Sequence, residues 1–267
     1  MNKKTPAKAN RIWVALLVVL TFGGTALLVG GCANTKKQEK KKGENIRDAE
    51  WHYEMGAGYF ENNKIYPAIR ELTKALEMDP EMEKAHFLLG FIYSGRKKYH
   101  KAIQHYKEAL RLNPKFFKAK NNLGSIYLAM ERWRDAAEIF RGLLDESMYP
   151  TPELAHNNLG WAQYNLRRYS KALEHLKMAV FLKPEMCLAY NNLGLTHEAM
   201  GNMAKAIENY QKSIRKCPNN YAEPHFNLGK IMQSRGERGA RRHFKRCLEL
   251  EPDTNLGERC REYLSVR

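Results

Sequence analysis

Residues 89–114 read LGFIYSGRKKYHKAIQHYKEALRLNP, and this stretch contains the features that decide the fold. Gly90 follows a leucine, the small Ala102 comes twelve residues later, and the large Tyr106 comes four residues after that. From Ala102 onward the apolar residues recur at the 3.6-residue spacing of an amphipathic helix. Pro114 closes the block, because proline cannot continue a helix interior. The stretch therefore predicts a helix, a turn and a second helix.

The same arrangement occurs six times along the chain, at steps of 34 to 36 residues. The glycines that mark it are Gly56, Gly90, Gly124, Gly160, Gly194 and Gly229. The small residues are Ala68, Ala102, Ala136, Ala172, Ala206 and Ala240, and the large ones are Leu72, Tyr106, Phe140, Leu176, Tyr210 and Phe244. Two antiparallel helices approach closely only where the side chains at their crossing are small. No single block buries its apolar face alone, so the six blocks are expected to stack into one folding unit.

The spacing, the residue sizes and the closing prolines resemble the tetratricopeptide repeat over residues 49–252. This resemblance implies an all-α fold, a right-handed superhelical solenoid of six tetratricopeptide repeats. Departures are small: Gln163 stands where the repeat usually has an aromatic residue, and Ser213 replaces the late alanine of the fifth copy. Residues 253–267 are expected to form a capping helix that covers the exposed apolar end of the stack.

The N-terminus has the charge order of an export signal. Four basic residues precede an apolar stretch that ends in two glycines directly before Cys32. The segment Val29-Gly30-Gly31-Cys32 resembles a bacterial lipobox, which implies a lipoprotein signal peptide over residues 1–31 and acylation of Cys32. The alternative is an uncleaved inner-membrane anchor, since about 18 apolar residues just span a bilayer. By resemblance to enterobacterial sorting, Ala33 favours the periplasmic face of the outer membrane.

Residues 32–48 contain a lysine-rich run, residues 36–43, which is too charged to bury. We interpret it as a flexible tether, and contact with anionic lipid is the alternative. Loss of the leader takes four positive charges from the formal +16 of the chain and leaves about +12. For an exported protein nucleic acid is not an expected partner, so this excess is expected to serve acidic protein surfaces or the membrane.

Besides Cys32 the chain has four cysteines, an even number that suits disulfide formation in an oxidising compartment. Cys187 opens the first helix of the fifth copy and Cys217 ends its second. Two antiparallel helices bring these ends together, so a disulfide between them is predicted. Cys247 and Cys260 lie on the last repeat helix and the segment after it, and the sequence leaves open whether they pair. The alternative is that all four are small buried thiols.

The sequence contains no catalytic constellation, because it lacks an HExxH motif, a CxxC pair and a glycine-rich phosphate loop. The chain is therefore predicted not to be an enzyme and to need no cofactor and no metal. His100 and His105 are interpreted as exposed surface residues. His86 and His156 share one repeat position and are interpreted as packing residues.

Function is expected on the concave face, which the first helix of every copy lines in such an array. The candidate binding residues flank the repeat glycines, and they are Tyr53, Tyr59, Phe60, Phe87, Phe91, Asn121, Asn122, Asn157, Asn158, Trp161, Asn191 and Asn192. An asparagine side chain both donates and accepts hydrogen bonds, so a ladder of them can pair with the backbone of an extended peptide. Aromatic residues would add apolar anchoring. The alternative is that the asparagines cross-link neighbouring helices and the aromatics form inter-repeat core.

The connection at residues 145–152, between the third and fourth copies, adds two residues to the repeat and has two prolines around Thr151. It is expected to bend or offset the stack, and the alternative is a neutral surface insertion. A Tyr-Pro turn in the middle of a six-repeat exported lipoprotein resembles the type IV pilus pilotins of the PilF/PilW/Tgl family.

This second resemblance implies a monomeric lipoprotein that binds the secretin subunit of the type IV pilus machine. It would promote the outer-membrane localisation and multimer assembly of that subunit, with the contact on the aromatic first copies. A periplasmic lipid-anchored scaffold for cell-envelope enzymes or outer-membrane protein assembly is the main alternative. An inner-membrane adaptor for an exopolysaccharide synthase is a third possibility, which requires an uncleaved leader.

Overall fold

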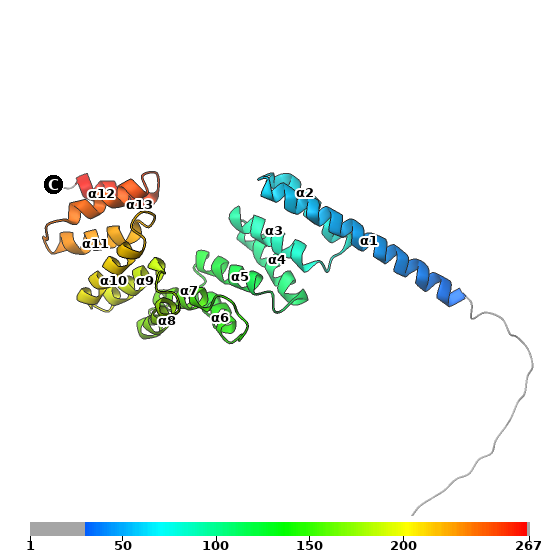
Figure 1. Ribbon diagram of the computed structural model, residues 1–267, viewed down its shortest axis with the longest axis horizontal. Coiled ribbons are helices and arrows are strands. Elements are labelled where there is room, and N and C mark those ends of the chain that lie inside the picture. The colour runs from blue at the N-terminus through cyan, green and yellow to red at the C-terminus, as the bar shows by residue number, and fades with distance from the viewer. Residues whose placement is uncertain (1–29, 266–267) are drawn as a thin grey trace, which may run out of the picture. The chain divides into compact units, whose positions relative to one another are not determined.

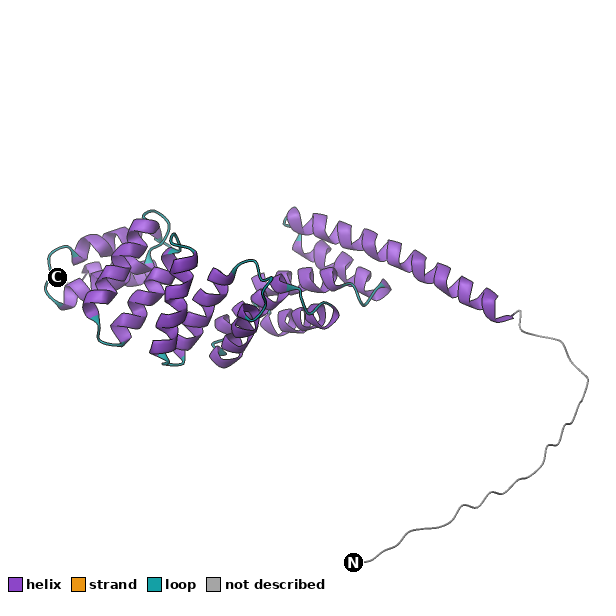
Figure 2. Ribbon diagram, turned by 60° about the horizontal axis from the view of Figure 1, so that its bottom comes forward, coloured by secondary structure: helices purple, strands orange, loops and turns teal. Residues whose placement is uncertain are grey.

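The structure, a computed structural model, describes residues 30–265, and every regular element in this range is a helix (Figures 1 and 2). The first helices are α1 (Gly30–Glu61), α2 (Ile65–Met78), α3 (Glu83–Gly95), α4 (Tyr99–Leu112), α5 (Phe117–Ala129), α6 (Trp133–Leu144) and α7 (Pro152–Asn165). They are followed by α8 (Tyr169–Leu182), α9 (Cys187–Ala199), α10 (Met203–Lys216), α11 (Glu223–Ser234), α12 (Ala240–Leu250) and α13 (Asn255–Ser265).

Residues from Asn45 onward form one unit, and the earlier part of α1 belongs to a separate one. In the second unit the helices make six consecutive pairs, from α1–α2 to α11–α12, and α13 follows as a single terminal helix (Figure 1). From α2 onward each helix packs against its neighbours in sequence, and the first helices of the second to fifth pairs also contact one another, as α7 does with α9. These pairs confirm the predicted solenoid of six repeats with a capping helix.

The repeat glycines lie where the two helices of a pair cross. A Cβ atom built on Gly160 of α7 would lie 2.6 Å from Leu176 Cγ of α8, and one on Gly124 would lie 2.7 Å from Phe140 Cζ. Both large partners are fully buried. The glycine therefore makes room for the large residue sixteen positions later, which is the close approach that the sequence pattern predicts.

The end of the first helix of each pair has the same backbone geometry in all six repeats. One residue adopts a left-handed conformation, and the six are Asn63, Lys97, Glu131, Arg167, Gly201 and Gly236. In the second repeat the Lys98 amide donates to the Tyr93 carbonyl, and the Lys97 amide donates to the Ser94 carbonyl. This is the Schellman motif, which satisfies carbonyl groups at the end of the first helix. Only two of the six positions are glycine, so the sequence pattern does not reveal the motif.

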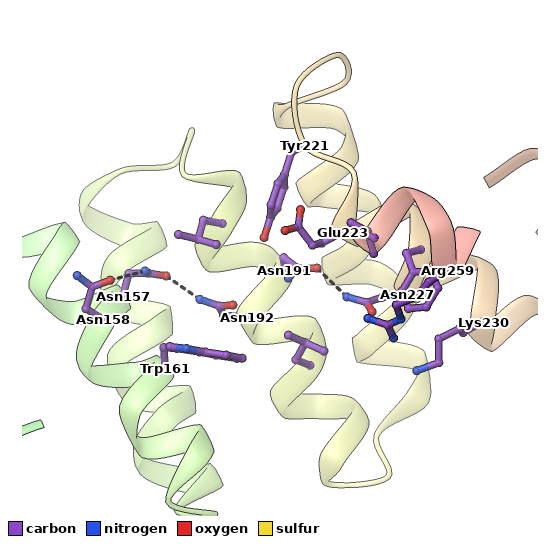
Figure 3. A pocket seen from close by; sticks show the side chains of 14 residues that line it. Asn157, Asn158, Trp161, Asn191, Asn192, Tyr221, Glu223, Asn227, Lys230 and Arg259 are labelled. Carbon is purple, nitrogen blue, oxygen red and sulfur yellow. Dashed lines mark hydrogen bonds between the residues drawn. The ribbon is translucent and has the colours of Figure 1, made fainter. Parts of the chain in front are cut away.

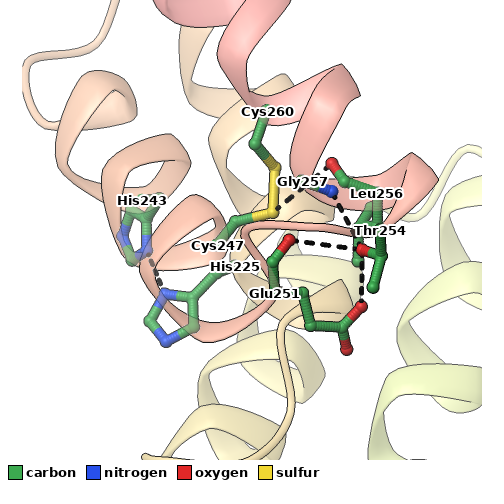
Figure 4. The surroundings of a disulfide bond; sticks show 8 residues. All are labelled: His225, His243, Cys247, Glu251, Thr254, Leu256, Gly257 and Cys260. Atoms are coloured by element: carbon green, nitrogen blue, oxygen red, sulfur yellow. Dashed lines mark hydrogen bonds between the residues drawn. A yellow bond between two sulfur atoms is a disulfide. The ribbon is translucent and has the colours of Figure 1, made fainter.

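The terminal helix α13 covers the end of the last pair. The Thr254 hydroxyl accepts from the Gly257 amide at 3.2 Å and caps the start of the helix (Figure 4). Tyr263 stacks on Phe244 with the ring centroids 4.7 Å apart and meets Phe226 edge-on. The helix therefore buries apolar surface that the sixth repeat would otherwise expose.

The lysine-rich segment is helical, where the sequence favours a flexible tether. Residues 36–43 lie within the bounds of α1, Gly30–Glu61. Lysine, glutamate and glutamine are good helix formers, and the segment has no proline, so propensity allows the helix to continue. Cys32 also lies within α1, whereas the apolar part of the leader lies outside the described residues. Among the helices of residues 30–265, none combines the length and apolar character that crossing a membrane requires.

Candidate functional site

The first helices of the middle and last repeats place the candidate residues around two pockets. One pocket, called here the asparagine pocket, has a volume of about 520 Å³ and is lined from α7, α9, α11 and α13 (Figure 3). The other, called the aromatic pocket, has a volume of about 340 Å³ and is lined from α3, α5, α7 and the turn before α7. Because α7 contributes to both pockets, they lie along one run of first helices.

The asparagines form hydrogen bonds across repeats, as one of the two sequence interpretations proposes. Asn192 Nδ2 donates to Asn157 Oδ1 at 3.0 Å, and Asn157 Nδ2 donates to Asn158 Oδ1 at 3.0 Å (Figure 3). Asn227 Nδ2 donates to Asn191 Oδ1 at 3.1 Å. These bonds join the fourth repeat to the fifth and the fifth to the sixth, and they fix the orientation of each amide.

The same asparagines also line the asparagine pocket, so cross-linking does not remove them from the binding surface. Asn157 is only 2% exposed, whereas Asn158 is half-buried at the rim. An amide that uses one donor and one acceptor in the wall still has a second N–H and further oxygen lone pairs. Trp161 adds an apolar surface to this pocket and stacks on Tyr164 with the ring centroids 5.1 Å apart. The pocket therefore combines oriented amides with an aromatic face.

The last repeat and the capping helix add charged residues that the sequence reasoning does not identify. Lys230 of α11 and Arg259 of α13 both line the asparagine pocket. The Arg259 guanidinium lies 4.3 Å from the ring centroid of Phe226, and Lys230 Nζ lies 5.7 Å from the same centroid. Arg259 is 29 residues from Lys230 in sequence, and only the packing of α13 on the sixth repeat brings them to one ring.

Glu223, at the start of α11, is the acid in the wall of the asparagine pocket. Burial raises the pKa of its carboxyl, and the nearby Glu251 raises it further. Its Oε2 atom is buried without a hydrogen-bond partner among the described residues. Burial also raises the pKa of Tyr221, which lies beside it. Both shifts have the same cause, because burial disfavours the charged form of an acidic group.

The aromatic pocket contains Phe87 and Phe91 of α3 together with Asn121 and Asn122 of α5. Phe91 is 46% exposed and makes an edge-on contact with Phe60, with ring centroids 5.8 Å apart. Asn122 Nδ2 donates to the Tyr106 hydroxyl at 3.2 Å. The structure thus brings these predicted residues into one surface of mainly apolar character.

The two earlier tyrosines are not part of this pocket. Tyr53 and Tyr59 pack partly buried against the core of the first two repeats. Lys84 Nζ lies 4.5 Å from the ring centroid of Tyr53. They therefore stabilise the start of the array, and the aromatic surface begins with Phe60.

The turn between the third and fourth repeats forms a wall of the aromatic pocket. Tyr149 is 8% exposed, and its hydroxyl donates to Asn121 Oδ1 at 3.3 Å. Its ring meets Phe117 edge-on, and Pro150 and Thr151 also line the pocket. The longer turn is therefore not a neutral surface insertion, because its tyrosine is inserted between helices.

Pairs of histidines meet inside three repeats. The Nδ1 atoms are 3.1 Å apart in His86–His105, 3.2 Å apart in His156–His175 and 3.0 Å apart in His225–His243. His105 is half-buried, so its interpretation as an exposed surface residue is wrong. The signal for these pairs is a histidine four residues before the glycine and another about fifteen after it.

Both cysteine pairs form disulfides, Cys187–Cys217 and Cys247–Cys260. The first joins the ends of the fifth repeat, as the sequence predicts, and the second, which the sequence leaves open, attaches α13 to α12 (Figure 4). Within residues 30–265 no group of three or more histidine, cysteine or acidic side chains has the geometry to hold a metal ion.

The chain is similar in structure to several solved repeat proteins. PilW, described as a widely conserved type IV pilus biogenesis factor, is 21% identical with a TM-score of 0.68, over 79% of this chain and 97% of PilW. PilF of Pseudomonas aeruginosa is 17% identical with a TM-score of 0.65, over 82% of this chain and 99% of PilF. YrrB, described as having an unusual peptide-binding site, is 21% identical with a TM-score of 0.50, over 72% of this chain and 97% of YrrB. At these identities the likeness establishes the fold.

None of the curated proteins matches the sequence closely enough to indicate a relative. Models of the tetratricopeptide repeat match residues 83–116 and 187–220, and a second model of the same repeat matches residues 121–186. Together these matches span half of the chain, and the six helix pairs extend the pattern on both sides. The chain belongs to the tetratricopeptide-repeat family.

Proposed function

We propose that this protein binds an extended segment of a partner protein along its first helices. The observation that carries the proposal is the pair of neighbouring pockets with different chemistry on one run of helices. The aromatic pocket would take a bulky apolar side chain, and the asparagine pocket would pair with backbone amides and polar groups. YrrB, a protein of the same fold, is described as having a peptide-binding site, which supports this use of the array.

We further propose that the partner is the secretin subunit of a type IV pilus machine and that the protein acts as its pilotin. Two features support this: the fold extends over nearly the whole length of PilW and PilF, and the segment that ends at Cys32 resembles a lipobox. Acylated Cys32 would hold the protein at the periplasmic face of the outer membrane. The anchor would raise the local concentration of the bound subunit there, which favours insertion and multimer assembly.

The test is the state of the secretin in a deletion strain, followed by immunoblot of unboiled membranes. The expected result is loss of the heat-resistant multimer while the monomer persists, with the full-length gene restoring the multimer. A Cys32→Ser variant should still fold, but it should not restore the outer-membrane multimer in the deletion strain. Unchanged multimers in the deletion strain would reject the pilotin role and favour a scaffold for other envelope proteins.

A point variant tests whether the aromatic pocket takes part. Phe91→Ala removes an exposed ring from the pocket and should reduce the secretin multimer in the complemented strain. Phe181→Ala is the matched control, because Phe181 on α8 is 77% exposed and lines neither pocket. Equal multimer levels in the two strains would exclude the aromatic pocket from the contact.

A further inference from the structure

Two cations share one aromatic ring at the C-terminal end of the asparagine pocket. Arg259 and Lys230 both lie within cation–π distance of the Phe226 ring, which is 2% exposed. Figure 3 shows the two side chains on the same side of the pocket as Asn227. Cation–π contacts offset part of the repulsion between like charges, and they fix where the charges lie.

No acidic side chain of residues 46–265 forms an ion pair with either cation. Glu223 lines the same pocket, but it forms an ion pair with neither cation, and burial raises the pKa of its carboxyl. Glu198 lies near Lys230 on another side, where its carboxylate accepts a hydrogen bond from the Tyr210 hydroxyl. Within the described residues, the pocket therefore has an end at which two cationic side chains lie on one ring and neither forms an ion pair.

We propose that Lys230 and Arg259 bind side-chain carboxylates of an acidic, extended partner segment, so that the capping helix is part of the binding site. The inference rests on the proposed function, because it assigns a partner chemistry to the same groove. A guanidinium recognises a carboxylate through two parallel hydrogen bonds, and the ammonium adds a second point of charge. Acidic residues at one end of the segment and a bulky apolar residue toward the aromatic pocket would satisfy both pockets.

The surroundings favour a peptide over other anions. Asn191, Asn192 and Asn227 line the same pocket and present amide groups, which match the N–H and C=O groups of a peptide backbone. A nucleic acid or a lipid surface is usually bound by a longer row or patch of basic residues. Here the wall of the pocket carries only these two cations together with the acid Glu223.

The second disulfide acts as a positioning element for Arg259. Cys260 is the next residue in α13 and is fully buried in its bond to Cys247 of α12 (Figure 4). Leu256, one turn earlier, also lines the pocket. Because the bond fixes α13 on the sixth repeat, it also fixes the guanidinium over Phe226.

The experiment measures binding of a fluorescein-labelled peptide of alternating glutamate and alanine to the full chain in detergent micelles, by fluorescence anisotropy. Alternation places all the carboxylates on one side of an extended peptide. The control peptide has glutamine at every glutamate position. The protein variant is Lys230→Gln with Arg259→Gln, and its matched control is Arg238→Gln with Lys245→Gln, which removes two exposed charges outside the pocket.

The expected result is that the glutamate peptide binds at least about tenfold more weakly to the pocket variant than to the control variant, the effect of losing charge-assisted hydrogen bonds. Lys230→Arg with Arg259→Lys, which keeps both charges, should retain most of the binding. Equal losses in the two neutralised variants, or equal binding of the glutamine peptide, would overturn the proposal by showing that only net charge matters. The secretin immunoblot tests the pilotin role separately, so either idea can fail alone.

Discussion

His86 and His105 face each other inside the second repeat with their Nδ1 atoms 3.1 Å apart. His86 Nε2 lies 3.2 Å from the Pro80 carbonyl oxygen, which only accepts, so this nitrogen carries the proton. His86 Nδ1 is therefore an acceptor, and His105 Nδ1 donates to it. The bond needs at least one neutral ring, because two protonated rings would place two Nδ1–H donors against each other.

We predict that these pairs make the fold sensitive to mild acid. Burial, together with the neighbouring His86 and Lys101, lowers the pKa of His105 to about 4, and burial likewise lowers the pKa of His225 to about 4. The unfolded chain binds these protons near pH 6.5, so it holds more protons than the folded chain between pH 6.5 and 4. The contribution of these histidines to the free energy of unfolding is therefore fully present above pH 6.5 and is lost as the pH falls toward 4.

Urea unfolding at pH 7 and pH 5 measures this effect in a window where most carboxylates stay ionised. His105→Gln should reduce the difference in unfolding midpoint between the two pH values, because glutamine does not titrate. His100→Gln, at an exposed position of the same helix, is the control and should leave the difference unchanged. A difference that is the same in all three proteins would contradict the prediction.

Gly160→Ala should destabilise the fold by about 1–3 kcal/mol, because the new methyl group would overlap the buried side chain of Leu176. Gly58→Ala is the matched control, since nothing lies within 4 Å of a Cβ at that helical position. It should leave stability unchanged or raise it by roughly 0.5–1 kcal/mol. Thermal or urea unfolding of both variants checks the contrast, and similar behaviour of the two would be inconsistent with a close helix crossing at Gly160.

Glu131→Gly should stabilise the protein by roughly 0.5–1 kcal/mol. Glu131 has φ of 57° in the turn of the third repeat, a conformation that costs a residue with a Cβ about 1–2 kcal/mol. Glycine adopts this conformation without that cost. Part of the gain is lost, because glycine also gives the unfolded chain more conformational entropy. Glu131→Ala separates the backbone effect from the loss of charge. If alanine stabilises as much as glycine, the turn conformation is not the cause.

Cys247→Ser with Cys260→Ser should release α13 from the sixth repeat. The bond joins cysteines with a sequence separation of 13 residues. A disulfide that closes a loop of about this size stabilises the folded state by about 3 kcal/mol, because it restricts the unfolded chain. Hydrogen exchange should show faster exchange in residues 255–265 while α3 and α4 stay protected. The same variant should bind the glutamate peptide more weakly if α13 holds Arg259 in the pocket. Unchanged protection of α13 would mean that Tyr263 packing alone holds it.

The sequence by itself determined the repeat architecture. Its repeat of 34 to 36 residues, its glycines and its closing prolines specify helix pairs, because each glycine meets a large residue only about sixteen positions later in the same pair. It also predicted the Cys187–Cys217 bridge, since antiparallel helices place the ends of one repeat together. The candidate asparagines and Phe91 were identified from the same periodicity, which assigns them to the first helices.

Only the tertiary structure decided how these residues combine. The Asn192–Asn157 bond, the contact of Tyr149 with Asn121, and the position of Arg259 beside Lys230 join residues about thirty positions apart. Repeat spacing does not specify such contacts, because they depend on the side-chain directions and on how each helix pair packs on the next. The histidine pairs and the left-handed turns were hidden for a related reason: the residue types at those positions vary between repeats, while the packing and backbone geometry stay the same.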